Sequence, residues 1–425
     1  MNMRFIIPVL LTVLSPVFAA ERVLPIGLKG PGADYESEVP EGFQRLALGD
    51  APPDFNLIGV DDKFHTLSEY KGGKILMVVF LSNHCPYSHA QEARMIPLIN
   101  KLKPMGLKVV AIQPNTPLPE YATGLAYSKY NDTFEEMKLY AKENKFTFDY
   151  LYDGDTQETS KAFGALATPH VYLFDENLKL RYAGRFDDGR FEEAESVTNH
   201  ATRDALDAMM AGKPVAVPFT KPYGCSVKWT TPDEKAMAGY KSKWKHEPIT
   251  MGTIDAAGVA ALAKNPTQKL RLFNVWSSTG INSVEKLGEF SALAQRLDRR
   301  DFEVITISLD TAAGQETALK HLQDAHVGMP TRIKESIEKE GRATNNFRYS
   351  GKMAADVAKA LDPKWPGAPL PHTVLIAPGG EVLWRYTGAG FDPVPLRRLI
   401  LDRLGVMFEN DGRYTEAKKG SSKAK

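Results

Sequence analysis

A cysteine at the start of a predicted helix is the strongest chemical feature of the sequence. An apolar run rich in β-branched residues, Ile75–Leu81, ends in a polar turn that leads to Cys85 and Pro86. The Ala-, Gln- and Glu-containing segment that follows favours a helix, and proline is well tolerated at a first helical position. A thiolate at a helix N-terminus faces free N–H donors and the positive end of the helix dipole, which lower its pKa. The pattern therefore predicts a reactive thiol at Cys85 rather than a small buried hydrophobe.

The chain has one other cysteine, Cys225, which is too far from Cys85 in sequence to form a C-x-x-C ring. In an oxidising compartment a lone reactive thiol favours a partner. We predict that folding brings Cys225 to Cys85, where it serves as the resolving thiol of a disulfide. A permanent structural disulfide between the same two residues and a free thiol are the alternatives.

The first 20 residues have the pattern of a secretory signal peptide. Arg4 provides a positive start, Phe5–Phe18 is apolar, and Val17-Phe18-Ala19 provides a cleavage site, with Ala20 as a close alternative. The apolar segment is short for a bilayer span and is interrupted by prolines. We expect residues 1–20 to be removed, which leaves a periplasmic or secreted protein with no stable membrane anchor. A retained N-terminal anchor is the alternative.

Length and composition are those of an ordinary globular protein. The 425 residues suffice for two or three domains, with 43% hydrophobic and 25% charged residues. The formal net charge is +1, and no long basic stripe is present. The composition therefore indicates that nucleic acid is not a partner.

After an irregular lead-in (21–47), residues 48–214 alternate between strand and helix patterns. A small hairpin is expected within 55–67, before the strand that leads to Cys85. The other expected strands cover 107–113, 148–152, 167–175 and 179–185, and the other expected helices cover 133–144, 156–163 and 198–210. This order predicts an α/β domain with a central mixed β-sheet flanked by helices.

Four short motifs in this region carry a family resemblance. They are Asn83–Tyr87, Thr168-Pro169-His170, Leu180–Gly184 and Gly224–Trp229. As a set they resemble the thioredoxin-like superfamily, and more narrowly its peroxiredoxin-like redoxin (AhpC/TSA-type) branch. The resemblance implies a thiol active site at Cys85 and a cis proline at Pro169 that faces it.

The resemblance also implies a substrate-binding surface beside the thiol. Thr168 and Pro169 would present backbone groups to a substrate chain. Pro86, Tyr87 and Ser88 would line the approach to the thiol, and an exposed position on the helix is the alternative for Ser88.

The chain departs from both family patterns, which leaves the reaction open. Thioredoxins have a second cysteine where Ser88 stands, and its absence disfavours exchange through a local ring. Peroxiredoxins have the hydroxyl found here at Ser82, but they have proline where this chain has Val78. The two expected activities are thiol–disulfide exchange and antioxidant reduction of peroxide. The expected partners are protein thiols or disulfides, or peroxide, together with a reducing thioredoxin-like protein.

A role without catalysis is the alternative, and no cofactor or metal is predicted. In that interpretation the chain is a binding or copper-delivery module of thioredoxin fold. His84, Cys85, His89 and His170 would then supply soft N and S ligands.

The second half of the sequence repeats the first. Residues 215–248 form a proline-rich predicted linker that carries Cys225, and residues 249–407 form a second predicted thioredoxin-like domain. Strand patterns at 270–276, 302–309, 370–376 and 381–386 and a helix at 284–297 recur in the same order. Gly280 and Ser283 occupy the positions of Cys85 and Ser88, so the repeat is expected to lack thiol chemistry. We therefore predict two tandem thioredoxin-like domains and a polar tail (408–425).

Overall fold

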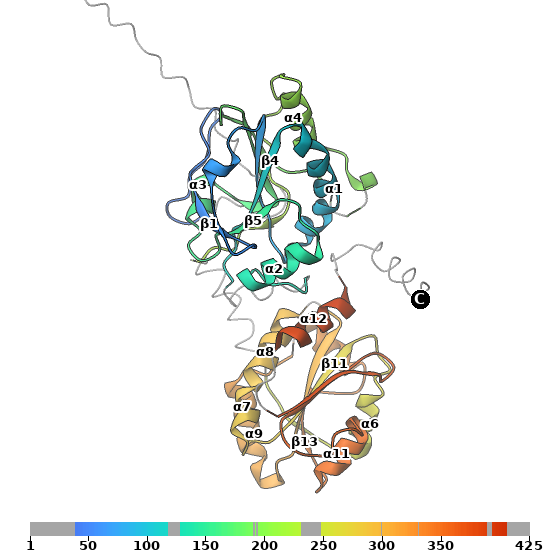
Figure 1. Cartoon of the computed structure of the whole chain (residues 1–425). Helices are drawn as coiled ribbons and strands as arrows, with labels where there is room; N and C mark the ends of the chain where they lie inside the picture. The colour runs from blue at the N-terminus through green and yellow to red at the C-terminus, as the bar shows by residue number, and fades with distance from the viewer. Residues whose placement is uncertain are drawn as a thin grey trace, which may run out of the picture.

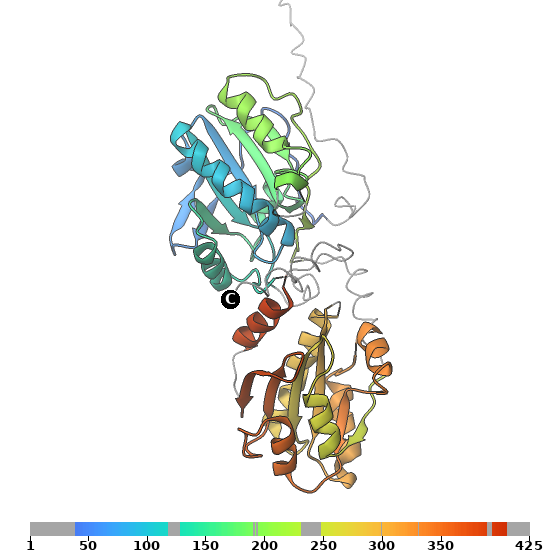
Figure 2. The same cartoon turned by 90° about the vertical axis from the view of Figure 1, so that its right-hand side faces the viewer.

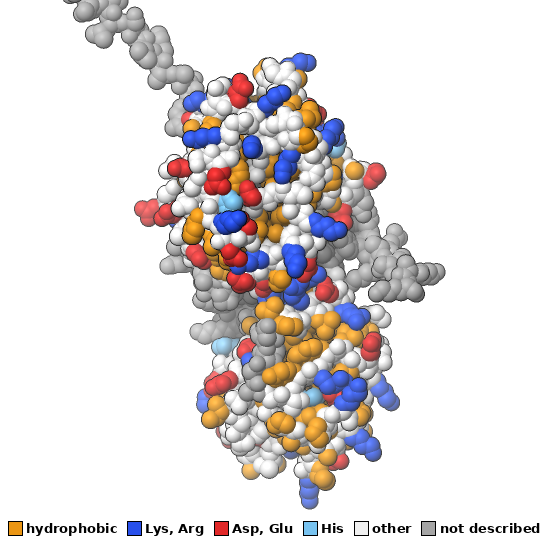
Figure 3. All heavy atoms as spheres, viewed as in Figure 1, with side chains coloured by type: hydrophobic (Ala, Val, Ile, Leu, Met, Phe, Trp, Pro, Cys, Tyr) orange, Lys and Arg blue, Asp and Glu red, His pale blue; other side chains and the backbone are white. Residues whose placement is uncertain are grey.

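The computed structural model describes residues 39–117, 128–189, 192, 194–230, 248–298, 300–329, 331–388 and 393–405. The expected signal peptide, most of the lead-in and the polar tail lie outside the described residues. The described chain forms two α/β units, each built around a central sheet with helices on its faces (Figure 1). Acidic and basic side chains are interspersed over both units on the face shown in Figure 3. Among the described residues, no helix combines the length and apolar character needed to cross a bilayer.

The first unit contains a seven-stranded mixed sheet in the order β2-β1-β5-β4-β3-β7-β8. Its central strand β3 is parallel to β4 and antiparallel to β7. All six residues of β3 are buried, which explains its uninterrupted apolar sequence. The strands are β1 (Asn56–Gly59), β2 (Phe64–Thr66), β3 (Ile75–Phe80), β4 (Leu107–Gln113), β5 (Asp149–Tyr152), β7 (His170–Asp175) and β8 (Leu180–Gly184).

Alternate residues of β3 face two hydrophobic clusters, one on each side of the sheet. On one side Met77 and Val79 pack with residues of α1 (Pro86–Leu102), α2 (Phe134–Glu143) and α4 (Ala201–Met210). On the other side Val78 and Phe80 pack with the 3-10 turn Leu67–Tyr70 and with α3 (Glu158–Phe163). Figure 2 shows α1 lying across the face of the sheet. The helix begins directly after Cys85, as the sequence predicts.

The segment 215–230 is not the surface linker that the sequence predicts. Its strand β9 (Cys225–Ser226) pairs antiparallel with β6 (Ala167–Thr168), and Val227 and Trp229 are buried in the first unit. The prediction was wrong because the prolines at 214, 218 and 222 interrupt any regular spacing of apolar residues in this segment. The apolar residues Val227 and Trp229 do have the two-residue spacing of a strand that is buried on one side. The first unit therefore extends to about residue 230 rather than ending at 214.

The second unit contains a six-stranded sheet in the order β10-β13-β12-β11-β14-β15. Its central strand β11 is parallel to β12 and antiparallel to β14, and β14 is antiparallel to β15, so these directions repeat those around β3. The strands are β10 (Gly252–Ile254), β11 (Leu270–Trp276), β12 (Phe302–Ser308), β13 (Asn346–Tyr349), β14 (His372–Ile376) and β15 (Val382–Thr387). The peptide bond before Pro169 is cis, as expected, and the bonds before Pro369 and Pro371 are also cis.

The helices of the second unit differ in part from the sequence-based expectation. The helix expected over 284–297 is divided into α7 (Ile281–Glu285) and α8 (Leu287–Arg296). Gly280 caps α7 as Cys85 caps α1, and Ser283 is buried like Ser88. The other helices are α6 (Ala256–Ala263), α9 (Gln315–Asp324), α10 (Thr331–Glu338), α11 (Ala354–Leu361) and α12 (Pro393–Leu404), none of which the sequence analysis identified.

Candidate active site at Cys85

Cys85 lies where two turns of the first unit meet. It caps the N-terminus of α1, and its side chain is fully buried. Its Sγ lies 3.0 Å from the carbonyl oxygen of Thr168, to which the S–H group donates when Cys85 is protonated. Thr168 directly precedes the cis proline Pro169. The β3–α1 turn and the β6–β7 turn therefore converge on the thiol.

The second cysteine is adjacent to the first. In the β6–β9 pair, Cys225 lies opposite Thr168, and its thiol is hydrogen-bonded to Cys85. Both thiols are reduced in this structure. A Cβ on Gly224 would lie 2.0 Å from the Thr168 carbonyl oxygen, so β9 can approach β6 this closely only because glycine precedes Cys225.

The two thiols have opposite pKa shifts. Burial alone would raise the pKa of Cys85, but the Cys225 hydrogen bond, the charge of His84 and the N–H of Ser88 lower it to about 5. For Cys225, the hydrogen bond to Cys85, burial and the negative charge on Cys85 raise the pKa well above its ordinary value. At neutral pH the site therefore holds a thiolate at Cys85 and a protonated thiol at Cys225.

A buried histidine–carboxylate pair lies beside the thiolate. His84 Nδ1 is hydrogen-bonded to Asp132 Oδ2, and both side chains are almost fully buried. Asp132 also accepts from Ser82 Oγ, from Asn83 N at 2.9 Å and from Asn115 Nδ2 at 2.8 Å. Burial alone would raise the pKa of Asp132, but His84 and these donors hold it below its ordinary value. The Ser82 hydroxyl is thus engaged with Asp132.

The charge on His84 makes a testable contribution to the reactivity of the thiol. Replacing His84 with Gln keeps a polar group beside Asp132 but removes the cation that favours the thiolate. We expect the pKa of Cys85 to rise by about one unit, which corresponds to about 1.4 kcal/mol. The pH dependence of the alkylation rate measures this pKa. His65→Gln, on β2, serves as the control, and an unchanged pKa in His84→Gln would contradict the role of His84.

Glu92 is a functional candidate that the sequence analysis missed. It lies about two helical turns after Cys85 on α1 and is only 3% exposed. Its Oε2 accepts from Tyr140 Oη, and its Oε1 has no partner among the described residues. Burial raises the pKa of Glu92 to about 8, opposed by the Tyr140 hydrogen bond and assisted by the charge on Cys85. The spacing of seven residues between Cys85 and Glu92 was the available sequence signal, because such residues share a helix face.

A cavity connects Glu92 with the surface on the α1–α2 side of the first unit. Its volume is about 520 Å³, and its lining includes Glu92, His89, Tyr130 and Tyr140. The carboxyl group of Glu92 therefore borders this cavity, and it is close enough to Cys85 for the charge of the thiolate to raise its pKa.

The neutral state of Glu92 predicts a specific pH dependence of stability. Its folded pKa of about 8 exceeds its ordinary value of 4.5, so the unfolded chain loses the proton first as pH rises through this interval. Stability from this group is therefore lost progressively between the two values. Glu92→Gln should raise the free energy of unfolding at pH 7 by roughly 1 kcal/mol or more.

Urea denaturation of reduced protein at pH 5 and pH 8 tests this expectation. The gain from Glu92→Gln should be larger at pH 8. The exposed residue Glu41 provides a matched control, because Glu41→Gln should change stability equally at both pH values. A gain from Glu92→Gln that is independent of pH would show that Glu92 is not held neutral.

The other histidines near Cys85 are held by hydrogen bonds within the protein. His89 Nε2 donates to the Asn83 carbonyl oxygen at 2.7 Å, and His170 Nδ1 accepts from Leu166 N at 3.2 Å. Burial lowers the pKa of His89 to about 4 and that of His170 to about 3. Within the described part of the chain, no group of three or more His, Cys, Asp or Glu side chains is arranged to hold a metal ion. The geometry thus offers no support for the copper-delivery alternative.

The remaining residues predicted for the site also lie around Cys85. Pro86 is the first residue of α1, and Ser88 is buried with its N–H directed at Cys85. The Tyr87 ring contacts the Tyr223 ring edge-on, with centroids 5.2 Å apart. Gln91 Nε2 also donates to the Tyr223 carbonyl oxygen at 3.2 Å. Segment 223–226 therefore covers the thiol and occupies the Thr168 edge at which a substrate chain was expected.

These features define the class of the protein. The strand order, the cysteine that caps α1 and the cis proline opposite it are those of a thioredoxin-like redoxin. Residues 48–183 match the AhpC/TSA family, and this part of the chain is an AhpC/TSA-family domain.

Individual relatives were also found. Chloroplastic peroxiredoxin Q of Sedum lineare is 24% identical over 152 residues, which cover 34% of this chain and 73% of the relative. An uncharacterised conserved protein of Geobacillus kaustophilus is 36% identical, with 44% of this chain and 94% of that chain covered and a TM-score of 0.39. A putative thiol:disulfide interchange protein DsbE of Chlorobium tepidum is 22% identical, with 39% and 99% covered and a TM-score of 0.29.

Proposed function

We propose that this protein is a thiol–disulfide oxidoreductase that cycles between a free Cys85/Cys225 pair and a disulfide between them. The observation that carries the proposal is that both cysteines lie against Thr168, the residue before the cis proline: Cys85 Sγ is 3.0 Å from the Thr168 carbonyl oxygen, and Cys225 pairs with Thr168 in the β6–β9 pair. The pKa values of the two thiols are shifted in opposite directions. A low pKa makes Cys85 the nucleophile, and a high pKa keeps Cys225 protonated until it is needed. The pair thus has one thiol for each half of an exchange reaction.

The proposed reaction takes place in two exchange steps. The Cys85 thiolate attacks one sulfur of a substrate disulfide, forms a mixed disulfide and releases the other substrate sulfur as a thiolate. Cys225 then loses its proton and attacks Cys85 Sγ, which releases the second substrate thiolate. The substrate disulfide gains two electrons, and the Cys85/Cys225 pair loses two and becomes a disulfide.

Glu92 is the proposed acceptor for the Cys225 proton. Its carboxyl group is buried, and burial together with the charge on Cys85 raises its pKa to about 8. When the mixed disulfide forms, the Cys85 charge disappears, and Glu92 then ionises more readily because one source of its raised pKa is gone. A proton acceptor thus becomes available at the step that requires one, and the cavity beside Glu92 leads from it to solvent.

Reduction of peroxide is the second candidate, favoured by the AhpC/TSA match and the similarity to peroxiredoxin Q. In that reaction the Cys85 thiolate attacks one peroxide oxygen, the O–O bond breaks, the other oxygen leaves as water or an alcohol, and Cys85 becomes a sulfenic acid. Cys225 then condenses with the sulfenic acid to give the disulfide and a water molecule. The site geometry favours disulfide exchange instead, because the Ser82 hydroxyl is bonded to Asp132. Val78, where peroxiredoxins have proline, is buried in the core.

Access to Cys85 requires segment 223–226 to move. Cys85 is fully buried, whereas Cys225 is partly exposed. The β6–β9 pair joins only Ala167 with Ser226 and Thr168 with Cys225, so its opening breaks few hydrogen bonds. A substrate chain that pairs with Thr168 would take the place of β9.

The proposed setting is outside the cytoplasm. A chain with the signal-like residues 1–20 would act in the periplasm or as a secreted protein, where its substrates would be protein thiols, protein disulfides or peroxide. A reducing thioredoxin-like partner would return the Cys85–Cys225 disulfide to the thiol pair.

Rapid-mixing kinetics separate the two reactions. Reduced protein should form a mixed disulfide with a model disulfide peptide faster than it forms sulfenic acid with an equal concentration of hydrogen peroxide. Trapping of each product and mass analysis give the two rates. Fast sulfenic acid formation with slow peptide exchange would instead assign peroxide reduction, and two slow reactions would favour a binding function.

A further inference from the structure

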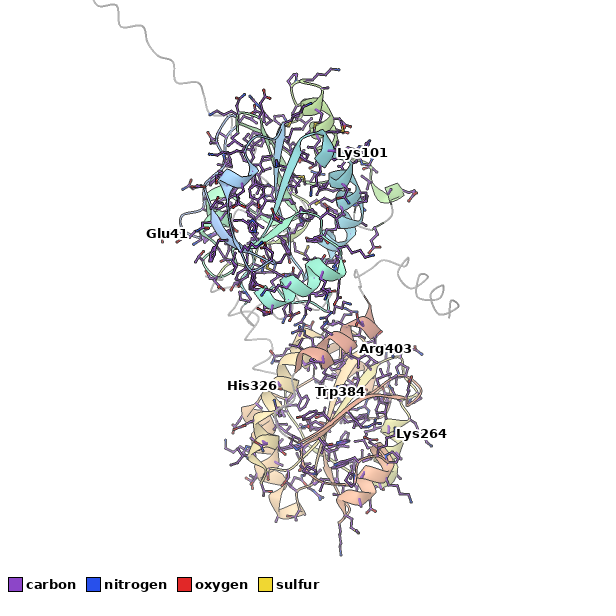
Figure 4. The ribbon with its side chains drawn as sticks, in the orientation of Figure 1. Glu41, Lys101, Lys264, His326, Trp384 and Arg403 are labelled. Atoms are coloured by element: carbon purple, nitrogen blue, oxygen red, sulfur yellow. The ribbon has the colours of Figure 1, made fainter. Side chains whose placement is uncertain are left out.

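The two units meet through arginines of the second unit and polar groups of the first. Arg296, the last residue of α8, is only 6% exposed. It donates to Asn131 Oδ1 at 2.7 Å and to the Ser128 carbonyl oxygen at 3.3 Å. Arg397 of α12 pairs with Glu136 of α2. Figure 1 shows α12 at the boundary between the units on the side of α2, and Figure 4 labels Arg403 near its end.

Residues 128–132 of the first unit, which Arg296 contacts, also bind the turn before Cys85. Ser128 Oγ donates to the Asn83 carbonyl oxygen at 2.9 Å, and Asn83 Nδ2 donates to the Asn131 carbonyl oxygen at 2.9 Å. Asp132 accepts from Asn83 N and binds His84. Residues 128–132 are thus bonded on one side to Arg296 and on the other to residues 83 and 84.

The arginines of the second unit face carboxylates of the first unit, including Asp132, which binds Asn83 and His84. Burial and the neighbouring Arg397 lower the pKa of Arg296, whereas the carboxylates of Glu136 and Asp132 oppose that shift. Arg296 therefore interacts electrostatically with Asp132, the partner of His84. Glu136 links Arg397 to the same segment, because its Oε2 accepts from Asn131 N at 2.7 Å while its Oε1 binds Arg397.

We propose that the second unit is a positioning module for the thiol site, and that Arg296 is the residue through which it acts. Arg296 fixes Ser128 and Asn131, these residues fix Asn83, and Asn83 orients the His84–Cys85 turn. This gives a role to a unit that has no cysteine of its own. The inference rests on the proposed function only in so far as Cys85 is a reactive thiol.

The test is the pKa of Cys85 in full-length, reduced Arg296→Gln protein. Loss of a cation near the network, together with a looser Asn83 turn, should raise that pKa by about half a unit or more. At pH 5 the alkylation rate should then fall about twofold. Arg403→Gln is the matched control, since it removes an exposed arginine of α12 near the same boundary. In this control variant the pKa of Cys85 should equal that of the wild type.

A second variant changes the same connection from the first unit. Asn131→Ala removes the side-chain acceptor of Arg296 and should also raise the Cys85 pKa. The Arg296→Gln/Asn131→Ala double variant should show little more than the larger single effect, because both changes interrupt one connection. Additive shifts, or equal shifts in Arg296→Gln and Arg403→Gln, would overturn the inference.

Three results can be distinguished. If wild-type Cys85 has an ordinary thiol pKa, the proposed function fails. If wild-type Cys85 has a low pKa and Arg296→Gln leaves it unchanged, only the positioning role fails. If Arg296→Gln does not fold, Asn131→Ala decides alone, and an unshifted pKa in that variant would overturn the role.

Discussion

Cys85→Ser should abolish turnover of disulfide and peroxide substrates alike and leave the fold intact. A serine hydroxyl at this position can still donate to the Thr168 carbonyl oxygen, so the local hydrogen bonds of the turn are kept. It cannot supply a thiolate at neutral pH, and an alkoxide is not an attacking group for thiol–disulfide exchange. We expect a loss of roughly a thousandfold or more, the order observed when an enzyme loses its nucleophile.

The comparison with two other variants makes this experiment specific. Ser88→Ala removes a hydroxyl that has no partner among the described residues, but it keeps the N–H that faces Cys85, so it should retain most activity. Cys225→Ser should retain the first exchange step. Turnover that persists in Cys85→Ser and disappears in Cys225→Ser would show that the roles of the two thiols are reversed.

The features that could be predicted from the sequence are those formed by residues that are consecutive in the chain. A buried strand, a capping cysteine and a proline at the first helical position are consecutive, so Cys85 could be placed at a helix start before any tertiary contact was known. The cis peptide at Pro169 was expected from its motif and is present. The fully buried strands β3 and β11 were found within about one residue, because an unbroken apolar run bounded by polar turns has few other interpretations.

The features that the sequence did not predict depend on contacts between distant segments. Asp132 reaches His84 from a segment 48 residues away, and nothing near Asp132 in the sequence marks it as a site residue. The raised pKa of Glu92 arises from burial under Tyr140, which only packing of α2 against α1 produces. The β6–β9 pair was missed for the same reason, because two short segments without periodicity meet only in the folded chain.

A Cys85–Cys225 disulfide should form in the oxidised protein and should open with mild thiol reductants without unfolding the chain. Cys225 lies opposite Thr168 in the β6–β9 pair, and the Thr168 carbonyl oxygen is 3.0 Å from Cys85 Sγ, so little rearrangement is needed to join the two sulfurs. A bridge that closes a loop of about 140 residues should stabilise the folded chain by about 5 kcal/mol if it is unstrained. The oxidised protein should therefore resist urea better than the reduced protein.

The direction of reduction follows from exposure and pKa. Cys225 is partly exposed and Cys85 is buried, so a reducing thiolate reaches the Cys225 sulfur first. Attack on Cys225 expels Cys85, and a thiol with a pKa of about 5 is a good leaving group in exchange. The disulfide is thus open to reduction at the Cys225 sulfur. Closure of the long loop between residues 85 and 225 nevertheless stabilises the disulfide-bonded form.

Two replacements of Cys225 separate its hydrogen bond from its redox role. Cys225→Ser keeps an O–H donor beside Cys85, so the thiolate should stay stable, whereas Cys225→Ala removes the donor and should raise the Cys85 pKa. Neither variant can resolve a mixed disulfide. Both should therefore complete one exchange step and stop with the substrate bound to Cys85, and a difference in pKa should distinguish them.

Mass mapping of non-reduced peptides tests both parts of this prediction. The wild type after air oxidation should yield the 85–225 linked peptide, and both Cys225 variants after addition of a disulfide substrate should yield an adduct on Cys85. Free thiols in air-oxidised wild type would remove the bridge from the mechanism. Repeated turnover by Cys225→Ser would mean that resolution comes from another molecule, because Cys85 is then the only cysteine left in the chain. The hydrogen bond from Cys225 would in that case serve only to stabilise the Cys85 thiolate.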